Sequence, residues 1–241
     1  MAYINNNKII SLGGIKRAYL NNTLIFQSFA KVVDKLPEYD VTAVFNVTST
    51  TSQTKLCYSP SPFTEMYVDG EQIDVTSGYT FNTTGEHTVN YMLADNTTIG
   101  DLAFYYCRSL TSVDIGNSVT RIGNNAFGGC SSLTSIEIPD SVTRIDNNAF
   151  SYCRSLTSVT IPSSVTSIGD NTFNGCESLS SITCLATTAP TLGTDVFYGL
   201  PENGTLIYPC DSDYDIWLEQ LGWEDTCNQD IPPEEELPEY D

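Results

Sequence analysis

The sequence predicts a mainly β protein: an N-terminal hairpin, a small β-sandwich, and then a β-solenoid with a helical cap. Three observations support this fold class. One 23-residue motif recurs in register, and a fixed period of 20 to 50 residues is typical of solenoids, whose units are too small to bury an apolar face alone. Segments before the repeats alternate apolar and polar residues with the period of strands. Asn, Gly and Pro residues typical of turns separate these segments.

Residues 1–34 are expected to form a β-hairpin that acts as an anchor. The stretches IKRAYL and TLIFQ flank Asn21 and Asn22, and an Asn-Asn pair adopts the positive φ angles of a two-residue hairpin turn. A single hairpin is marginally stable by itself. We therefore expect it to pack on the next domain, on another subunit or on a larger assembly.

Residues 35–93 predict a small sandwich of immunoglobulin-like type. Asp69 and Gly70 form a tight turn between two strands, and Pro60 and Pro62 are confined to a loop or an edge. The Trp and the paired Cys of a true immunoglobulin domain are absent from this segment. Six short stretches rich in Val, Thr, Tyr and Phe are the candidate strands: VTAVFNV, TKLCY, FTEMYV, EQIDV, YTF and HTVNYML.

Residues 94–208 hold the repeats. After a half repeat, IGDLAFYYC, full units begin at Leu110, Leu133, Leu156 and Leu179. In each unit, L-x-x-[VI]-x-[IC] predicts a strand, and the segment that ends in F-x-x-C predicts the connection that leads back to the next strand. The last unit is one residue longer and lacks the cysteine, as terminal units commonly do. Two columns of side chains are expected to form the core: Phe104, Phe127, Phe150 and Phe173, and Cys107, Cys130, Cys153 and Cys176.

The column cysteines are expected to be buried, reduced thiols. Stacked units lie ~4.8 Å apart with parallel side chains, whereas a disulfide needs facing Cβ atoms about 3.8 Å apart. Cys57 and Cys184 are singletons. Cys210 and Cys227 flank the C-terminal segment, and the sequence leaves open whether they pair. No CxxC or Cys/His grouping indicates zinc, so we expect no metal and no cofactor.

Residues 209–241 predict a helical cap and an acidic tail. The stretch DSDYDIWLEQLGW predicts a short helix capped by Asp211 or Ser212. Its Ile216, Trp217 and Leu221 are expected to cover the open end of the solenoid. The tail, IPPEEELPEYD, is rich in proline and acid and is expected to be extended.

The repeat stretch LTSIEIPDSVTRIDNNAFSYC resembles the BspA-like, or treponemal-type, leucine-rich repeats over residues 96–200. The resemblance implies a leucine-rich-repeat solenoid of the kind found in surface adhesins of Bacteroidetes and spirochaetes, and in their phages. The sequence departs from classical leucine-rich repeats, because Ser118, Ser141 and Ser164 replace the conserved Asn that follows the strand there. A looser resemblance links GGIKRAYLNNTLIFQ to short hairpins of phage tail and virion accessory proteins.

Charge and hydropathy exclude several classes of partner. The chain has 30 acidic and 10 basic residues, and residues 155–241 carry 16 acids and no Lys or Arg. This field repels phosphate backbones, so we expect no nucleic-acid partner. No apolar run approaches the ~18 residues of a membrane span, so we expect no membrane insertion. The stretch MAYINNNKIISLGG lacks the pattern of a secretory signal peptide.

The sequence offers little for catalysis. His87 is the single histidine, and its place in the alternating strand HTVNYML predicts a surface position. A G-x-S-x-G elbow and a Gly-rich phosphate loop are both missing. Asp211, Asp213 and Asp215 begin like a calcium loop, but the glycine and the terminal glutamate of that loop are replaced. We therefore expect a non-enzymatic protein without a metal site.

Candidate binding residues lie on the outside of the repeats. If Leu110, Val113 and Ile115 point inward, the residues between them face outward, which makes two polar ladders on one face. A second pair, Arg121 and Arg144, is expected either to clamp acidic groups of a partner or to pair with Asp146 or Glu137. The face is interpreted either as a recognition surface for a protein or glycan or as solvated β-surface. The ladder residues are Ser112, Asp114, Ser135, Glu137, Ser158, Thr160, Ser181 and Thr183.

The leading functional hypothesis is an adhesion module on a bacteriophage virion, as a fibre or decoration protein. The N-terminal hairpin would contact other virion proteins, and the solenoid would bind a protein or glycan on the host surface. The alternative is a Bacteroidetes cell-surface adhesin of the BspA-like type. A glycan-active enzyme is the third hypothesis and needs paired carboxylates in a cleft. Homo-oligomerisation is left open.

Overall fold

A computed structural model describes residues 39–210 and 212–228, together with four two-residue strands before them. These strands are β1 (Ile4–Asn5), β2 (Lys8–Ile9), β3 (Tyr19–Leu20) and β4 (Thr23–Leu24). β1 pairs antiparallel with β2, and β3 pairs antiparallel with β4. The β3–β4 pairing joins Leu20 to Thr23, which agrees with the expected hairpin. The acidic tail from residue 229 onward lies outside the described residues.

The segment before the repeats is β-structure whose strands agree closely with the candidates. The turn at Asp69 and Gly70 has φ angles of 49° and 84°, which are the positive values that a tight hairpin turn needs. It joins Val68 to Glu71, which are paired. The strands are β5 (Val41–Val47), β6 (Thr54–Lys55), β7 (Phe63–Val68), β8 (Glu71–Ile73), β9 (Gly78–Tyr79) and β10 (Gly85–Leu93).

The arrangement of these strands differs from an independent immunoglobulin-like sandwich. Only β6 and β9 form a separate pair, and the other four strands belong to a six-stranded sheet with the order β14-β12-β5-β10-β7-β8. In this sheet β5 runs antiparallel to the first solenoid strand, with Val41 opposite Ile115. The expected boundary at residue 93 is therefore not a boundary of the sheet. One continuous apolar core runs from Val41 to Trp223.

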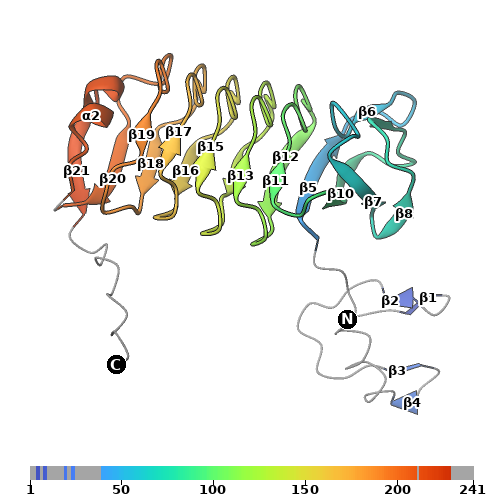
Figure 1. The fold of residues 1–241 in the computed structure, drawn as a ribbon. Coiled ribbons are helices and arrows are strands. Elements are labelled where there is room, and N and C mark those ends of the chain that lie inside the picture. Colours follow the sequence, from blue (N-terminus) through green and yellow to red (C-terminus); the bar gives the residue numbers. More distant parts are fainter. Residues whose placement is uncertain are drawn as a thin grey trace, which may run out of the picture. The chain divides into compact units, whose positions relative to one another are not determined.

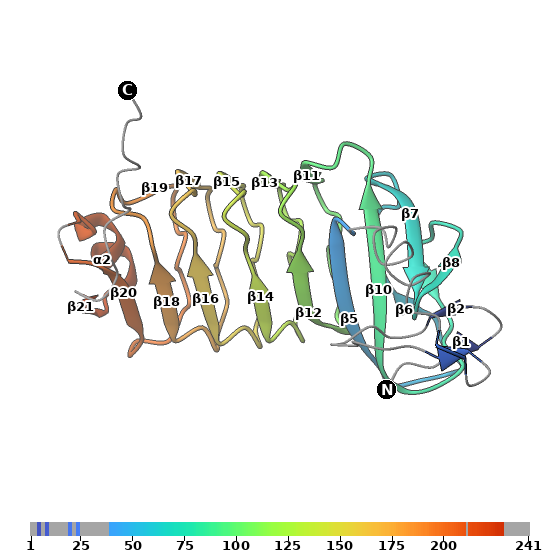
Figure 2. The same ribbon diagram turned by 90° about the horizontal axis from the view of Figure 1, so that it is seen from below.

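The solenoid consists of successive coils that lie side by side (Figure 1). One face carries the longer strands, seen in a row in Figure 2: β12 (Leu110–Ile115), β14 (Ser135–Glu137), β16 (Ser158–Ile161), β18 (Ser181–Cys184), β20 (Thr205–Pro209) and β21 (Glu224–Asn228). The other face is a parallel five-stranded sheet: β11 (Thr98–Ile99), β13 (Arg121–Ile122), β15 (Arg144–Ile145), β17 (Ser167–Ile168) and β19 (Thr191–Leu192).

The phenylalanine column forms a continuous stack inside the solenoid. Neighbouring rings from Phe104 to Phe173 are within 8° of parallel, with centroids 5.1 to 5.5 Å apart, and Phe197 of the last unit extends the stack at 6.1 Å. The four column Phe residues before Phe197 each donate their backbone N–H to the next coil, as Phe127 does to the carbonyl of Ala149 at 2.8 Å. The stack therefore combines apolar burial with satisfied backbone groups.

The cysteine column lies beside this stack as free, buried thiols. Each thiol donates to a backbone carbonyl of the preceding unit: Cys130 to Phe104, Cys153 to Phe127 and Cys176 to Phe150, at 3.0 to 3.2 Å. Burial raises the pKa of Cys130 and of Cys176 to about 12 and that of Cys153 well above its usual value. The thiols are therefore inert groups that connect one coil to the next.

Serine side chains form a ladder at the position that follows each of the first three longer strands. Ser141 donates to the carbonyl of Val119 at 2.6 Å, and Ser164 donates to the carbonyl of Val142 at 2.7 Å. Ser118 belongs to the first coil and donates instead to the carboxylate of Asp40 at 2.9 Å. The hydroxyl thus bonds the preceding coil, and at the first coil it bonds the segment that covers the solenoid's end.

The C-terminal end is closed by helix α2 (Asp215–Leu221) and strand β21. Trp217 is buried, packs 5.3 Å from the ring of Phe197, and donates its indole N–H to the carbonyl of Pro190 at 3.0 Å. Leu221 is partly buried, as expected, but Ile216 is exposed. The helical period explains this, because Tyr214, Trp217 and Leu221 share one face and Ile216 lies on another.

The start of the helix differs from the expected cap. Tyr214 occupies the N-cap position without a side-chain capping bond, and the carboxylate of Asp213 accepts the N–H of Asp215 at 3.2 Å. Ser212 instead donates its backbone N–H to the carbonyl of Pro209. Tyr214 takes the N-cap position because its buried hydroxyl donates to the carbonyl of Ala186 at 2.8 Å. The other expected cap, Asp211, lies outside the described residues.

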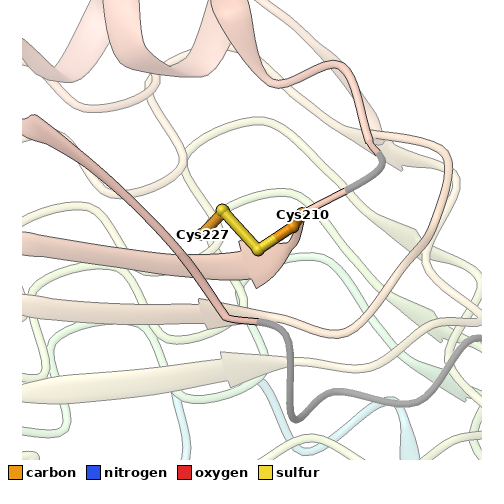
Figure 3. The surroundings of a disulfide bond; sticks show 2 residues. All are labelled: Cys210 and Cys227. Atoms are coloured by element: carbon orange, nitrogen blue, oxygen red, sulfur yellow. A yellow bond between two sulfur atoms is a disulfide. The ribbon is translucent and has the colours of Figure 1, made fainter.

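Strand β21 was not predicted, and the sequence left open the disulfide that the structure shows beside it. β21 pairs in parallel with β20, so the longer-strand face continues to residue 228, beyond the expected end of the solenoid at 208. Cys210 and Cys227 form a disulfide, with their Cα atoms 4.7 Å apart (Figure 3). This bond joins the ends of the segment that contains α2 and thereby fixes the cap to the last full coil.

Candidate functional site

The outward ladders lie on the longer-strand face. Ser112 pairs with Ser135 and Asp114 with Glu137 across β12 and β14. Five members are exposed, and three are half-buried: Ser112, Ser181 and Thr183. The hydrogen-bonded pairing runs β12–β14 and then β16–β18–β20–β21, so the ladder is divided into two pieces. The structure places these residues together on a polar surface, but it does not gather them into a pocket.

The arginine pair is neutralised within the molecule. Asp146 is buried, with a side chain only 1% exposed, and both its oxygens are occupied by guanidinium groups. Arg121 donates its Nε–H to Oδ2 at 2.6 Å, and Arg144 donates to Oδ1. Of the two expectations for this pair, the internal ion pair with Asp146 is the observed one. The arrangement satisfies a buried carboxylate, and Asp101, 4.0 Å from Arg121, supplies the second negative charge that balances the pair.

His87 is buried rather than on the surface, so that prediction was wrong. Its Nδ1 lies 2.7 Å from Asp69 Oδ2, and its Nε2 lies 3.0 Å from the carbonyl oxygen of Thr83. The ring packs 4.3 Å from Phe81. Both ring nitrogens therefore have partners, and the histidine connects the Asp69 turn to the Thr83 loop. Asp69 also accepts the backbone N–H of Thr88 at 3.0 Å.

A hollow of about 380 Å³ lies along the turns that connect the two faces of the solenoid. Its lining comes from three consecutive units: Tyr106, Arg108, Gly129, Ser131, Tyr152 and Arg154. The first and third units contribute a Tyr and an Arg, and the middle unit contributes a Gly and a Ser. We call this feature the Tyr/Arg hollow. It was not predicted from the sequence.

Alternation of residue size creates the hollow. The position two residues after each column Phe is Tyr106, Gly129, Tyr152 and Gly175 in successive units, all with φ between 56° and 73°. A Cβ added to Gly129 would lie 2.7 Å from Tyr106 Cδ1, and one added to Gly175 would lie 2.7 Å from Tyr152 Cδ1. Each tyrosine ring therefore needs a glycine in the next unit. The sequence signal was present as YCR, GCS, YCR and GCE at intervals of 23 residues.

Electrostatics distinguish the hollow from the rest of this acidic chain. The Arg108 guanidinium lies 5.4 Å from the Tyr106 ring centroid and that of Arg154 lies 5.8 Å from Tyr152. Arg154 also pairs with Glu177 at 3.2 Å, and both side chains are more than half exposed. Within the described residues, no ion pair involves Arg108. The hollow therefore presents two cations and two aromatic rings to solvent.

In the part of the chain that the structure describes, no group of three His, Cys, Asp or Glu side chains is arranged to hold a metal ion. None of the helices in this part of the chain has the length and apolar character to cross a bilayer.

Comparisons with known proteins relate the repeats to one family. The profile described as BspA type leucine rich repeat region matches residues 97–212 in six copies. No curated protein matches the chain.

Solved structures of bacterial leucine-rich repeat proteins also match. One is a leucine rich cell surface protein from Faecalibacterium prausnitzii A2-165, with 38% identity over 49% of this chain and 36% of that chain, and a TM-score of 0.39. Another is a leucine-rich repeat protein from Bacteroides capillosus ATCC 29799, with 26% identity over 53% of this chain and 97% of that one, and a TM-score of 0.36. The chain thus spans about a third of the Faecalibacterium protein.

The family match coincides with the coils described above. It begins one residue before β11 and ends between β20 and α2. Residues 97–212 of this chain are therefore a BspA-type leucine-rich repeat region.

Proposed function

We propose that this chain is a non-enzymatic recognition module displayed on a bacterial cell surface, where the solenoid binds molecules outside the cell. The observation that carries the proposal is the Tyr/Arg hollow. Two of the five exposed large apolar side chains of the described residues line it, and each lies beside an arginine. Tyr and Arg are residue types that are enriched at binding hot spots.

The Cys210–Cys227 disulfide supports display outside the cytoplasm. Disulfides persist in oxidising environments and are rare in reducing ones. Cys227 is exposed, so a reducing compartment has access to this bond. The BspA-like resemblance implies the same location, since such repeats occur in surface adhesins. The virion role and the hairpin's role as an anchor stay predictions, because residues 1–38 are mostly outside the described part of the chain.

Two observations favour binding over catalysis. The lining of the Tyr/Arg hollow contains no carboxylate, whereas glycoside hydrolysis needs a pair of them. The single histidine has partners on both ring nitrogens and is shielded by Phe81, so it is not available as a general base.

Surface display is tested on intact cells that express the native gene. Antibody against the solenoid should label unpermeabilised cells, and external protease should remove that signal while a cytoplasmic marker survives. Labelling only after permeabilisation would contradict surface display.

Recognition is tested with the purified full chain on immobilised mucin and on host epithelial cells. Two variants separate the candidate surfaces. Tyr152→Gly/Arg154→Ser removes one wall of the hollow, and Thr160→Arg places a bulky cation on the exposed ladder of β16. Loss of binding in the first variant alone assigns recognition to the hollow, and loss in the second alone assigns it to the ladders. Absence of binding by the unmodified chain on both surfaces would reject recognition of these host surfaces.

A further inference from the structure

We propose that the Tyr/Arg hollow binds a carboxylate-bearing sugar residue of an acidic glycan. The tyrosine rings would pack on the faces of the pyranose, and the arginines would bind its carboxylate. This inference rests on the proposed recognition function and names the ligand class of the hollow.

The tyrosines of the hollow are exposed enough to contact a ligand. Tyr106 is 43% exposed and Tyr152 is 50% exposed. Both have φ near 56°, a region that bulky side chains adopt rarely and at an energetic cost. The adjacent units place glycine at this position without that cost. An exposed aromatic residue in a strained conformation contributes little to the core, which points to a role in binding.

An aromatic ring offers the right surface for a sugar. The ring face carries negative charge in its quadrupole, and the axial C–H groups on a pyranose face are weakly positive. Tyr106 and Tyr152 are two units apart, which is about 10 Å at the usual strand spacing. The hollow's volume of about 380 Å³ falls within the range of small-ligand sites.

The arginines select for negative charge. Arg108 has no ion-pair partner among the described residues, and Arg154 is held only by the exposed Glu177, which is a weak contact that water already competes for. A guanidinium group binds a carboxylate through two parallel hydrogen bonds. Further cationic and aromatic side chains lie beyond the hollow: Lys55 lies over the Tyr58 ring, and Tyr58 packs on Tyr105. A longer acidic glycan has further contacts available there.

Backbone hydrogen bonding disfavours a peptide as the ligand. The N–H groups of Tyr106, Gly129 and Tyr152 donate to the carbonyls of Gly128, Ser151 and Asn174 in the next units, at 2.7 to 2.8 Å. The amides of Arg108 and Ser131 are bonded within their own turns. The hollow therefore offers no strand edge to which an extended peptide can add. Recognition there has to use side chains, which suits a sugar ring.

The experiment measures binding of the full chain to immobilised glycans by biolayer interferometry. The acidic probes are polygalacturonate and polysialic acid, which distinguish a hexuronic acid from a sialic acid. Fully methyl-esterified polygalacturonate keeps the ring and the linkage but lacks the charge, and poly-L-glutamate carries the charge without the ring. We expect binding to at least one acidic glycan that is tenfold or more stronger than binding to either control.

The matched variants use residues that this solenoid already carries. Tyr152→Gly/Arg154→Ser copies the Gly129-Cys130-Ser131 triplet of the middle unit, so it should fold, as thermal unfolding would verify. It should lose at least tenfold in affinity. Tyr198→Ala removes an exposed tyrosine outside the hollow and should bind like the unmodified chain. Arg108→Lys should weaken binding, because lysine keeps the charge but loses the bidentate geometry.

Three results would overturn the inference. They are absence of binding to both acidic glycans, equal binding to poly-L-glutamate, and unchanged affinity in the folded Tyr152→Gly/Arg154→Ser variant. The second result would indicate an acidic peptide or charge alone. If the chain still binds mucin or host cells in any of these cases, the recognition function stands and only the assignment of the ligand fails.

Discussion

The interior and the connecting turns of the solenoid follow different periods. In the interior, Phe and Cys recur every 23 residues, and every coil makes the same contacts with the next one. At the turns, the pattern repeats only every second coil, because Tyr-Cys-Arg alternates with Gly-Cys-Ser or Gly-Cys-Glu. Packing of the interior requires the shorter period, whereas the longer period makes a hollow that packing does not need.

The largest expected effect is in the interior, with Phe150→Ala. The ring is fully buried between Phe127 and Phe173, so its removal leaves a cavity with neighbours on both sides. We expect the free energy of unfolding to fall by about 3 to 5 kcal/mol. Chemical denaturation measures this change. A variant that unfolds like the unmodified chain would show that the stack does not stabilise the interior.

The disulfide at the closed C-terminal end is expected to contribute nearly as much to the free energy of unfolding. Cys210→Ser/Cys227→Ser removes the disulfide that encloses α2, and the chain-entropy model for a loop of this length gives a loss of about 3 kcal/mol. Reduction of the unmodified chain should lower stability by a similar amount. The double variant should then be insensitive to the reductant. Equal stability with and without the bond would mean that Trp217 and its contacts hold the cap unaided.

The column thiols make the interior sensitive to high pH. Burial raises the pKa of Cys130 and Cys176 from 9.0 to about 12, so the folded state keeps protons that the unfolded state releases. Stability is therefore unaffected below about pH 8 and falls between about pH 9 and 12, by up to about 1.4 kcal/mol per pH unit for each thiol. Cys130→Ala should reduce this slope. Denaturation at a series of pH values measures it, and an unchanged slope would argue against the raised pKa.

The smallest effect is expected at the turns, with Tyr152→Gly. The substitution releases a positive φ angle that costs a tyrosine about 1 to 3 kcal/mol, and it loses the contacts of a half-exposed ring. The two effects oppose each other, so the unfolding free energy should change by less than about 1 kcal/mol. Gly129→Tyr is the opposite exchange and should be clearly destabilising, because its side chain meets the Tyr106 ring. A large loss in Tyr152→Gly would give the turns a structural role after all.

The same difference explains what the sequence predicts well. Each 23-residue unit specifies its own buried residues, so the sequence predicts the Phe and Cys columns and the strands. The apolar face of the C-terminal helix likewise predicts the burial of Trp217. The hollow depends on alternate units, and a comparison of each unit with the consensus hides that pattern. The sequence alone allowed two interpretations of Arg121 and Arg144, a clamp for a partner or an internal ion pair. Only the coil geometry brings both arginines to the one carboxylate of Asp146.

Contacts between distant segments account for the errors. Val41 pairs with Ile115 across 74 positions, and nothing local indicates that β5 continues the solenoid's sheet rather than closing a separate sandwich. His87 is an exception, because it lies on the same face of its strand as the buried Val89 and Tyr91, so the alternation of the strand itself indicates burial. Strand β21 follows a helix and contains polar residues, and its position is fixed by pairing with β20 and by the disulfide.

The glycine beneath each tyrosine ring also limits how the gene can lengthen this array. Duplication of one 23-residue unit that carries Tyr-Cys-Arg would place two tyrosines in successive coils, where the second would collide with the first ring as a side chain at Gly129 does. Duplication of a Tyr unit together with its Gly unit preserves the contact and adds another hollow. Related genes of different length should therefore gain or lose tyrosine-bearing coils in blocks of 46 codons, and the number of hollows should increase with each block.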